Sequence, residues 1–132
     1  MKKTTLLNAG ISAVISTMGH TDMLTVADCG LPIRGGAERI DLALRQGVPA
    51  FLDTLDTILT ELCVERIILA EEIRTVSPGM HEEILKRFGE NVKVEYVPHE
   101  EFKKITEASK AVVRTGECTS YANVILVSGV AF

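Results

Sequence analysis

Apolar residues recur along the chain at two spacings, which separate segments that favour helices from segments that favour strands. Between Asn8 and Met18 they fall at Ile11, Val14 and Ile15, the spacing of one helical face. Asn8 is a favourable N-cap residue, so these positions predict an amphipathic helix. Three further helices are predicted to begin at Gly47-Val48-Pro49, at Ser77-Pro78 and at His99.

Short β-prone runs lie between these helices. Residues 64–70 are almost purely apolar, which is typical of a strand that is covered on both faces. Further strands are predicted over residues 23–27, 39–43, 93–97, 111–114 and 124–127. About six strands interleaved with about four helices indicate an α/β fold, a single three-layer domain whose sheet is flanked by helices.

The composition excludes several classes of protein. A length of 132 residues corresponds to about one domain, and an apolar fraction of 46% matches a packed core and not a disordered chain. Lys and Arg number 14 against 18 Asp and Glu, and the net charge of −4 repels a phosphate backbone, so nucleic acid is not expected as a partner. No apolar run reaches the roughly 20 residues of a membrane span, and the N-terminal run is too short for a signal peptide.

The cysteines and the missing motifs narrow the picture further. Cys29, Cys63 and Cys118 are odd in number and widely spaced, which argues against a disulfide framework or a zinc knuckle and favours a reducing cytoplasm. The chain also lacks a phosphate loop, a dinucleotide-binding turn, a nucleophile elbow and a paired-histidine zinc motif. None of these chemistries is therefore indicated.

Two polar residues follow the first predicted helix and the first predicted strand. His20 lies in the loop Gly19-His20-Thr21-Asp22, where an imidazole that changes protonation near neutral pH serves as a general acid or base, or is simply a surface histidine. Asp28 lies at the carboxyl end of the strand, the edge where open α/β sheets bind ligands. Its carboxylate is expected to accept sugar or polyol hydroxyls, or to cap the turn at Gly30.

Four more polar residues follow later strands. His99 begins a predicted helix, and Lys103 lies four residues on at the same helical face, so the two are candidates to converge on one ligand. Tyr121 and Asn123 are expected to point the same way at strand spacing, and offer a phenol and an amide to hydroxyl groups.

Two other chemically capable residues have simpler interpretations. His81 lies early in a predicted exposed helix and is expected to be solvated. Cys29 neighbours Asp28 but has no base nearby in sequence, so a small buried thiol is a better interpretation than a nucleophile.

Five segments, taken in order, resemble one known family. They are Gly19-His20-Thr21-Asp22, Ala27-Asp28-Cys29-Gly30-Leu31-Pro32, Ile40-Asp41-Leu42, Gly47-Val48-Pro49-Ala50-Phe51 and Thr115-Gly116-Glu117-Cys118-Thr119-Ser120-Tyr121-Ala122-Asn123. Together they look like the D-ribose pyranase family, which includes the related fucose mutarotases. The resemblance extends over essentially the whole chain.

The resemblance implies a cofactor-free mutarotase of the cytoplasm that uses no metal. Such an enzyme interconverts the pyranose and furanose rings of D-ribose and supplies the furanose to ribokinase. By the same resemblance His20 is the catalytic proton donor. A ring-shaped homo-oligomer is implied too, a decamer of two stacked pentamers with the sugar site near subunit contacts. The implied sugar-binding residues are Asp28, His99, Tyr121 and Asn123, with Lys103 as an additional candidate.

Three positions depart from the family pattern. Cys29 stands where we expect Ala, Cys118 where we expect a larger residue, and Ser120 where we expect Pro. These positions adjoin the expected site, so they bear on its shape and on the sugar it prefers. The sequence leaves two alternatives open: an L-fucose mutarotase, and a non-catalytic sugar-binding or regulatory module. It also leaves open which group acts as the base alongside His20.

Overall fold

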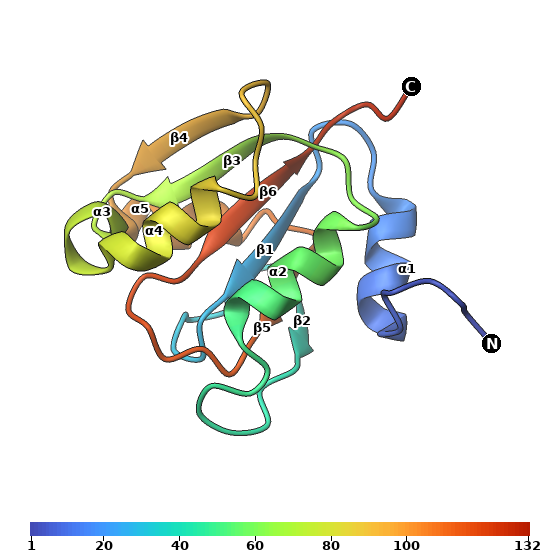
Figure 1. Cartoon of the computed structure of the whole chain (residues 1–132), viewed down its shortest axis with the longest axis horizontal. Helices are drawn as coiled ribbons and strands as arrows, with labels where there is room; N and C mark the ends of the chain where they lie inside the picture. The colour runs from blue at the N-terminus through green and yellow to red at the C-terminus, as the bar shows by residue number, and fades with distance from the viewer.

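A six-stranded mixed sheet runs through the middle of the computed structural model, which describes residues 1–132 (Figure 1). Its strands lie in the order β2-β5-β1-β6-β3-β4. The strands are β1 (Met23–Ala27), β2 (Glu38–Asp41), β3 (Val64–Ala70), β4 (Lys93–Val97), β5 (Ala111–Arg114) and β6 (Val124–Ser128). The helices are α1 (Ala9–Thr17), α2 (Phe51–Leu59), α3 (Ile73–Val76), α4 (Pro78–Leu85) and α5 (His99–Thr106).

One antiparallel strand determines which loops meet. β6 pairs antiparallel with both β1 and β3, whereas β1–β5, β2–β5 and β3–β4 are parallel pairs. The carboxyl ends of the five parallel strands therefore lie at one edge of the sheet, together with the amino end of β6. We call this the carboxyl edge, and it is where ligands bind in many open α/β sheets.

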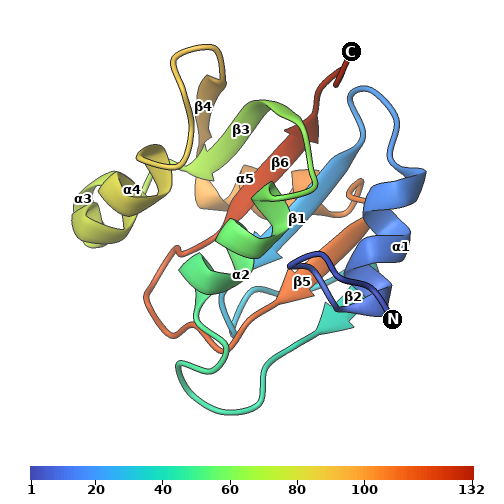
Figure 2. The ribbon, with the colours of Figure 1, turned by 45° about the vertical axis from the view of Figure 1, so that its right-hand side comes forward.

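Two apolar cores cover the two faces of the sheet and form three layers. Side chains alternate along β6, so Val124 and Leu126 pack into one core and Ile125 and Val127 into the other. Helices α1, α2 and α4 contribute to the first core, while Phe102 of α5 contributes to the second. Figure 2 shows α1 and α2 on one side of the strands and α5 on the other. The predicted three-layer α/β domain is confirmed.

Most predicted elements are confirmed, because their apolar residues are buried as the pattern required. The bounds of β1, β3, β4 and β5 agree with the prediction. The cap of α1 is also present, since the Ile11 amide donates to Asn8 Oδ1 at 2.9 Å.

Some boundaries and the number of helices differ from the prediction. Helix α2 begins at Phe51 and not at Pro49, because Val48 belongs to a tight turn in which its amide donates to the Arg45 carbonyl. Strand β2 ends at Asp41, where its partner β5 ends at Arg114. The structure also contains five helices, since the four-residue α3 is too short to show a helical pattern in the sequence.

The prediction for His81 is wrong. Its side chain is half-buried, and its Nε2 lies 2.7 Å from the Tyr96 hydroxyl on β4. Burial, followed by the nearby charge of Arg74, lowers the pKa of His81 below its ordinary value. His81 therefore joins α4 to the edge strand as a neutral residue and is not a solvated surface histidine.

None of the five helices combines the length and the apolar character that crossing a bilayer requires.

Candidate functional site

A polar hollow of about 260 Å³ opens at the carboxyl edge of the sheet. Asp28, after β1, lines it together with His99, after β4, and Tyr121, which precedes β6. Three loops that are distant in the sequence thus bring a carboxylate, an imidazole and a phenol to one place. The remaining lining residues are Gly30, Leu31 and Ser120.

Asp28 is held rigidly by a reciprocal pair of hydrogen bonds with Asn123. The Asp28 amide donates to Asn123 Oδ1 at 2.8 Å, and Asn123 Nδ2 donates to Asp28 Oδ2 at 2.9 Å. Asn123 is fully buried, so it supports Asp28 from behind and does not line the hollow. The other carboxylate oxygen, Oδ1, accepts from the Gly30 amide at 2.9 Å, so Asp28 also caps its own turn.

Each carboxylate oxygen of Asp28 carries two lone pairs and uses one of them within the chain. The remaining lone pairs suit hydroxyl donors. Both interpretations of Asp28, as hydroxyl acceptor and as turn cap, are therefore compatible with one geometry.

His99 occupies the first position of α5, immediately after β4. Its backbone amide donates to both carboxylate oxygens of Glu72, at 3.1 and 3.0 Å. Its ring meets Tyr121 edge-on, with centroids 5.0 Å apart. The Nδ1 atom is buried and has no hydrogen-bond partner within the chain, which is uncommon for a buried polar atom.

Tyr121 has an unusual backbone. Its φ is +62°, the left-handed region that side-chain-bearing residues seldom adopt. Tyr121 and Asn123 therefore do not alternate along a strand as predicted, because β6 begins only at Val124. A turn brings Tyr121 to the hollow and Asn123 to the interior, and local strain of this kind concentrates at functional sites.

The predicted convergence of Lys103 with His99 is not observed. Lys103 Nζ donates to Glu100 at 2.6 Å, and Lys103 lines a different hollow beside Arg34. The first turn of α5 supplies a nearby carboxylate, which draws the ammonium group along the helix surface.

His20 lies far from this hollow within one chain. It precedes β1, whereas Asp28 follows it, and five residues at about 3.3 Å each separate the two ends by roughly 16 Å. His20 Nε2 instead lies 2.9 Å from Glu65 Oε2. Glu65 is the second residue of β3, at the end of the sheet opposite the carboxyl edge. Asp28 therefore cannot contact His20 within one chain.

The backbone beside His20 is also strained. Thr21 has φ +69°, and a β-branched residue in this region is a genuine outlier. Its amide donates to the Ser128 carbonyl at 2.9 Å, which ties the loop to the end of β6. Thr21 and Tyr121 are the only two non-glycine residues with positive φ. Thr21 adjoins His20, and Tyr121 lines the polar hollow.

Cys29 is half-buried and lies beside another thiol, which the sequence did not indicate. Its Sγ is 3.6 Å from Cys118 Sγ, although the two residues are 89 positions apart. The hydrogen bond with Cys118, and then burial, raises the pKa of the Cys29 thiol. Cys29 is therefore protonated at neutral pH, as expected for a thiol that is not a nucleophile, but it is half-buried and not the buried thiol that the sequence predicted.

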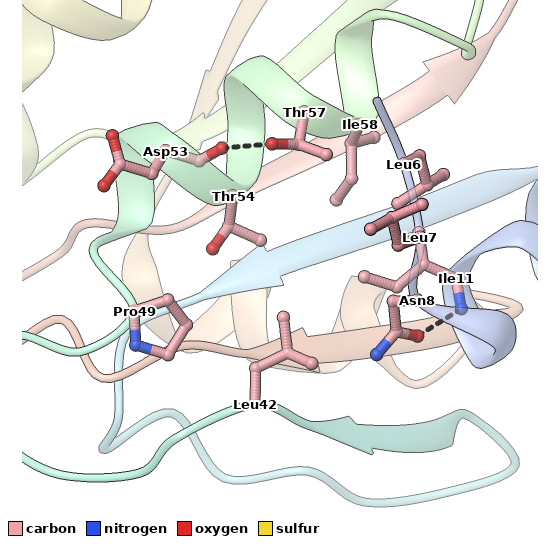
Figure 3. A pocket seen from close by; sticks show the side chains of 10 residues that line it. All are labelled: Leu6, Leu7, Asn8, Ile11, Leu42, Pro49, Asp53, Thr54, Thr57 and Ile58. Atoms are coloured by element: carbon pink, nitrogen blue, oxygen red, sulfur yellow. Dashed lines mark hydrogen bonds between the residues drawn. The ribbon is translucent and has the colours of Figure 1, made fainter. Parts of the chain in front are cut away.

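A second hollow, about 200 Å³, has an apolar lining and contains none of the predicted site residues. It lies between the N-terminal segment, α1 and α2 (Figure 3). Asn8 at its rim already caps α1, and the Thr57 hydroxyl donates to the Asp53 carbonyl. It offers few free polar groups to a hydrophilic ligand. The side chains drawn are Leu6, Leu7, Asn8, Ile11, Leu42, Pro49, Asp53, Thr54, Thr57 and Ile58.

Glu65 and Glu72 contact predicted site residues and were not singled out from the sequence. Glu72 follows β3 at the carboxyl edge, so the reasoning that identified Asp28 could also have found it. Glu65 carries no such signal, because its partner is 45 positions away. No group of three or more His, Cys, Asp or Glu side chains is arranged to hold a metal ion.

Comparison with known proteins gives matches over the full chain. The "RbsD / FucU transport protein family" matches residues 1–131. A D-ribose pyranase of Clostridium botulinum (strain Eklund 17B / Type B) is 56% identical over 132 residues, with all of both chains covered. The structure of Bacillus subtilis RbsD complexed with D-ribose matches with a TM-score of 0.95 and 44% identity, again over all of both chains.

A more distant structure shares the fold alone. It is the fucose mutarotase of Streptococcus pneumoniae in complex with L-fucose, 22% identical over all of both chains, with a TM-score of 0.79. The family match, the full-length identity and the common six-stranded sheet agree with the motifs of the sequence. This chain belongs to the RbsD/FucU family.

Proposed function

We propose that this protein is a D-ribose pyranase, an intramolecular isomerase that interconverts the pyranose and furanose forms of D-ribose. The observation that carries the proposal is the hollow at the carboxyl edge, where Asp28, His99 and Tyr121 offer groups that bind hydroxyls. Its volume of about 260 Å³ is below the roughly 300–1,000 Å³ of pockets for drug-sized ligands. A monosaccharide is smaller than such ligands, so the volume suits it. The names of the full-length relatives support the same substrate.

The reaction is acid–base chemistry on the sugar ring. A proton is added to the ring oxygen while the anomeric hydroxyl loses one, which opens the ring to the aldehyde. Attack by a different hydroxyl then closes the other ring, and no electron transfer or cofactor is needed. His20 donates the proton to the ring oxygen, and a positioned acid of this kind contributes about 10²- to 10⁴-fold to the rate.

In this proposal Asp28, His99 and Tyr121 bind the sugar, and the buried Asn123 acts on it only through Asp28. Asp28 accepts hydroxyl protons, and Asn123 keeps its carboxylate in place through two hydrogen bonds. Tyr121 and His99 form the adjoining wall of the hollow. The buried, unpartnered Nδ1 of His99 supports a ligand-binding role for this residue.

A complete site then requires two copies of the chain. His20 and Asp28 lie at opposite ends of β1, so one sugar cannot contact both within a single chain. We infer that His20 of a neighbouring copy faces the hollow, in a homo-oligomer that we propose to be a decamer of two pentameric rings. A cytoplasmic location and a functional link to ribokinase, which would take up the furanose, are part of the same proposal.

Magnetisation-transfer NMR on equilibrated D-ribose tests the function directly. The protein is expected to accelerate exchange between pyranose and furanose signals, and His20→Ala to reduce the acceleration at least about 100-fold. Sugar binding should persist, because His20 is not among the residues proposed to bind the sugar hydroxyls. His81→Gln is the matched control, since it changes a histidine that does not line the hollow and retains a hydrogen-bonding group toward Tyr96.

The alternatives give different results in the same experiment. Faster anomer exchange of L-fucose with no effect on ribose would make the protein a fucose mutarotase. Binding of ribose without any exchange would leave a non-catalytic sugar-binding module. Full activity in His20→Ala would remove His20 from its role as proton donor.

A further inference from the structure

The carboxylate of Glu65 is the one side chain that contacts the His20 ring by a hydrogen bond. The distance from His20 Nε2 to Glu65 Oε2 is 2.9 Å. Both side chains are largely accessible in the single chain, 55% and 43% exposed respectively. Exposed ion pairs contribute little to stability, so the contact does not serve mainly to hold the fold together.

The backbone of β3 is irregular at Glu65. Val64 pairs with Ser128 and Arg66 pairs with Val127, so Glu65 is an extra residue between two successive pairs. This is a β-bulge, which bends a strand locally and redirects a side chain. Gly129 allows the close approach, because a Cβ at that position would lie 3.0 Å from the Glu65 Cβ.

The loop that carries His20 is also held in place by backbone hydrogen bonds. Thr21 holds a φ of +69° and donates its amide to Ser128, while the Gly19 amide donates to Asp22 Oδ2 at 2.9 Å. His20 and Glu65 thus both lie in segments of irregular backbone, and both segments contact Ser128 at the end of β6. Irregular backbone of this type is retained where it positions functional groups.

We propose that Glu65 is the positioning residue of His20. Its carboxylate accepts a hydrogen bond from Nε2–H, which fixes the orientation of the ring and directs Nδ1 away from Glu65. Because Glu65 keeps a proton on Nε2, Nδ1 is the atom that exchanges protons with the sugar. In the doubly protonated ring Nδ1–H gives its proton to the ring oxygen, and the bare Nδ1 of the resulting neutral ring takes a proton back from the hydroxyl that attacks in the closing step. The inference rests on the proposed function, because it assigns the reacting atom of the proposed proton donor.

Glu65→Gln tests this role, because it retains the size of the side chain and removes the charge. An amide both donates and accepts, so it no longer selects a single tautomer of neutral His20. Glu95→Gln is the matched control. Glu95 is 38% exposed and pairs with Arg66 at 2.7 Å, and it forms no hydrogen bond with His20. Three quantities are measured on the assembled protein: ribose exchange, ribose affinity, and the ¹⁵N shifts of the His20 ring.

We expect Glu65→Gln to lower the maximal exchange rate at least about tenfold, as removal of an orienting carboxylate commonly does. The ribose Kd should change less than about twofold, and the ¹⁵N shifts should move from the Nε2–H tautomer toward a mixture. Glu95→Gln should match the parent in all three quantities. Thermal unfolding and sedimentation of each variant verify that fold and assembly are retained.

Exchange within twofold of the parent, with unchanged ¹⁵N shifts, would overturn the inference. A rate loss that accompanies a fall in assembly size, with the tautomer unchanged, would also overturn it, since Glu65 would then be a structural contact. If the parent itself does not accelerate exchange, the proposed function fails. The ¹⁵N spectrum then decides separately whether Glu65 orients the His20 ring.

Discussion

Asn123 shows how a single residue supports the hollow without lining it. It is fully buried, and both of its amide atoms are bonded to Asp28. A buried polar side chain is stabilising only while its partners are present, because an unpaired group loses its hydration without compensation. One of the two hydrogen bonds that hold the Asp28 carboxylate therefore comes from a residue 95 positions away.

Replacing Asn123 by Ala should therefore weaken both the fold and the hollow. We expect a loss of about 1–3 kcal/mol in the free energy of unfolding, since the Asp28 amide and Oδ2 lose their partners. Urea denaturation measures the first effect, and NMR titration with ribose should show weaker binding. Asn91→Ala, in the exposed turn before β4, should change stability by less than about 0.5 kcal/mol. Equal ribose affinity in Asn123→Ala and the parent would contradict the supporting role.

At the scale of elements, Glu117 joins the loop before β6 to the start of α2. Helix α2 has Ala50 at its N-cap, which offers no side-chain acceptor. Glu117 Oε2 accepts instead from the Phe51 amide at 3.2 Å, and Oε1 accepts from the Thr119 hydroxyl at 2.8 Å. One carboxylate thus caps a helix and shapes the loop that carries Tyr121.

Glu117 should make stability depend on pH. Burial acts to raise the pKa of Glu117, but the hydrogen bonds from Thr119 and Phe51 outweigh it and lower the pKa below the ordinary 4.5. The Glu117 carboxylate therefore contributes its full stabilisation of the folded protein above about pH 4.5. That contribution is lost as the pH falls through the lower pKa that Glu117 has in the folded state.

Urea denaturation of the parent and of Glu117→Gln between pH 7 and pH 3 measures this contribution. The variant should be less stable by about 0.5–2 kcal/mol at pH 7, the usual range for loss of a helix cap. The difference should shrink at the acidic end of the series. A difference that stays constant over the whole pH range would show that the carboxylate charge is not involved.

At the scale of the whole molecule, the sheet separates the proposed acid from the proposed sugar-binding residues. His20 lies beside the C-terminal tail in a hollow with Met18 and Gly129, at the end of the sheet opposite Asp28. Figure 1 shows the connection from α1 to β1 next to the C-terminus, far from the loop that precedes β6. In the proposed homo-oligomer, contact between copies brings the two ends together.

Mixed assemblies of two variants test this arrangement. His20→Ala and Asp28→Asn should each be inactive alone, and co-assembly of equal amounts should restore about a quarter of the sites, because each site takes one residue from each of two copies. Exchange NMR measures the recovery, and mass spectrometry verifies that the assemblies are mixed. Verified mixed assemblies without any recovery would contradict a site shared between subunits.

The local pattern of the chain was enough to predict most of the fold. Apolar runs predicted β1, β3 and β5, alternation predicted β4, and Asn8 predicted the start of α1, because these patterns depend on residues close in sequence. The start of α2 was missed, since the tight turn around Val48 competes with the helix for its backbone amides.

The residue types of the candidate site also followed from the sequence, but their arrangement did not. His20 and Asp28 are eight positions apart and lie at opposite ends of β1, because an extended strand moves the chain about 3.3 Å per residue. Asp28 and Asn123 are 95 positions apart and share two hydrogen bonds, and Cys29 and Cys118 meet across 89. The sequence by itself determined which segments form the layers and supplied the candidate residues for hydroxyl binding and proton transfer. Strand order alone decided which of these residues meet, since pairing between distant segments leaves no periodic signal along the chain.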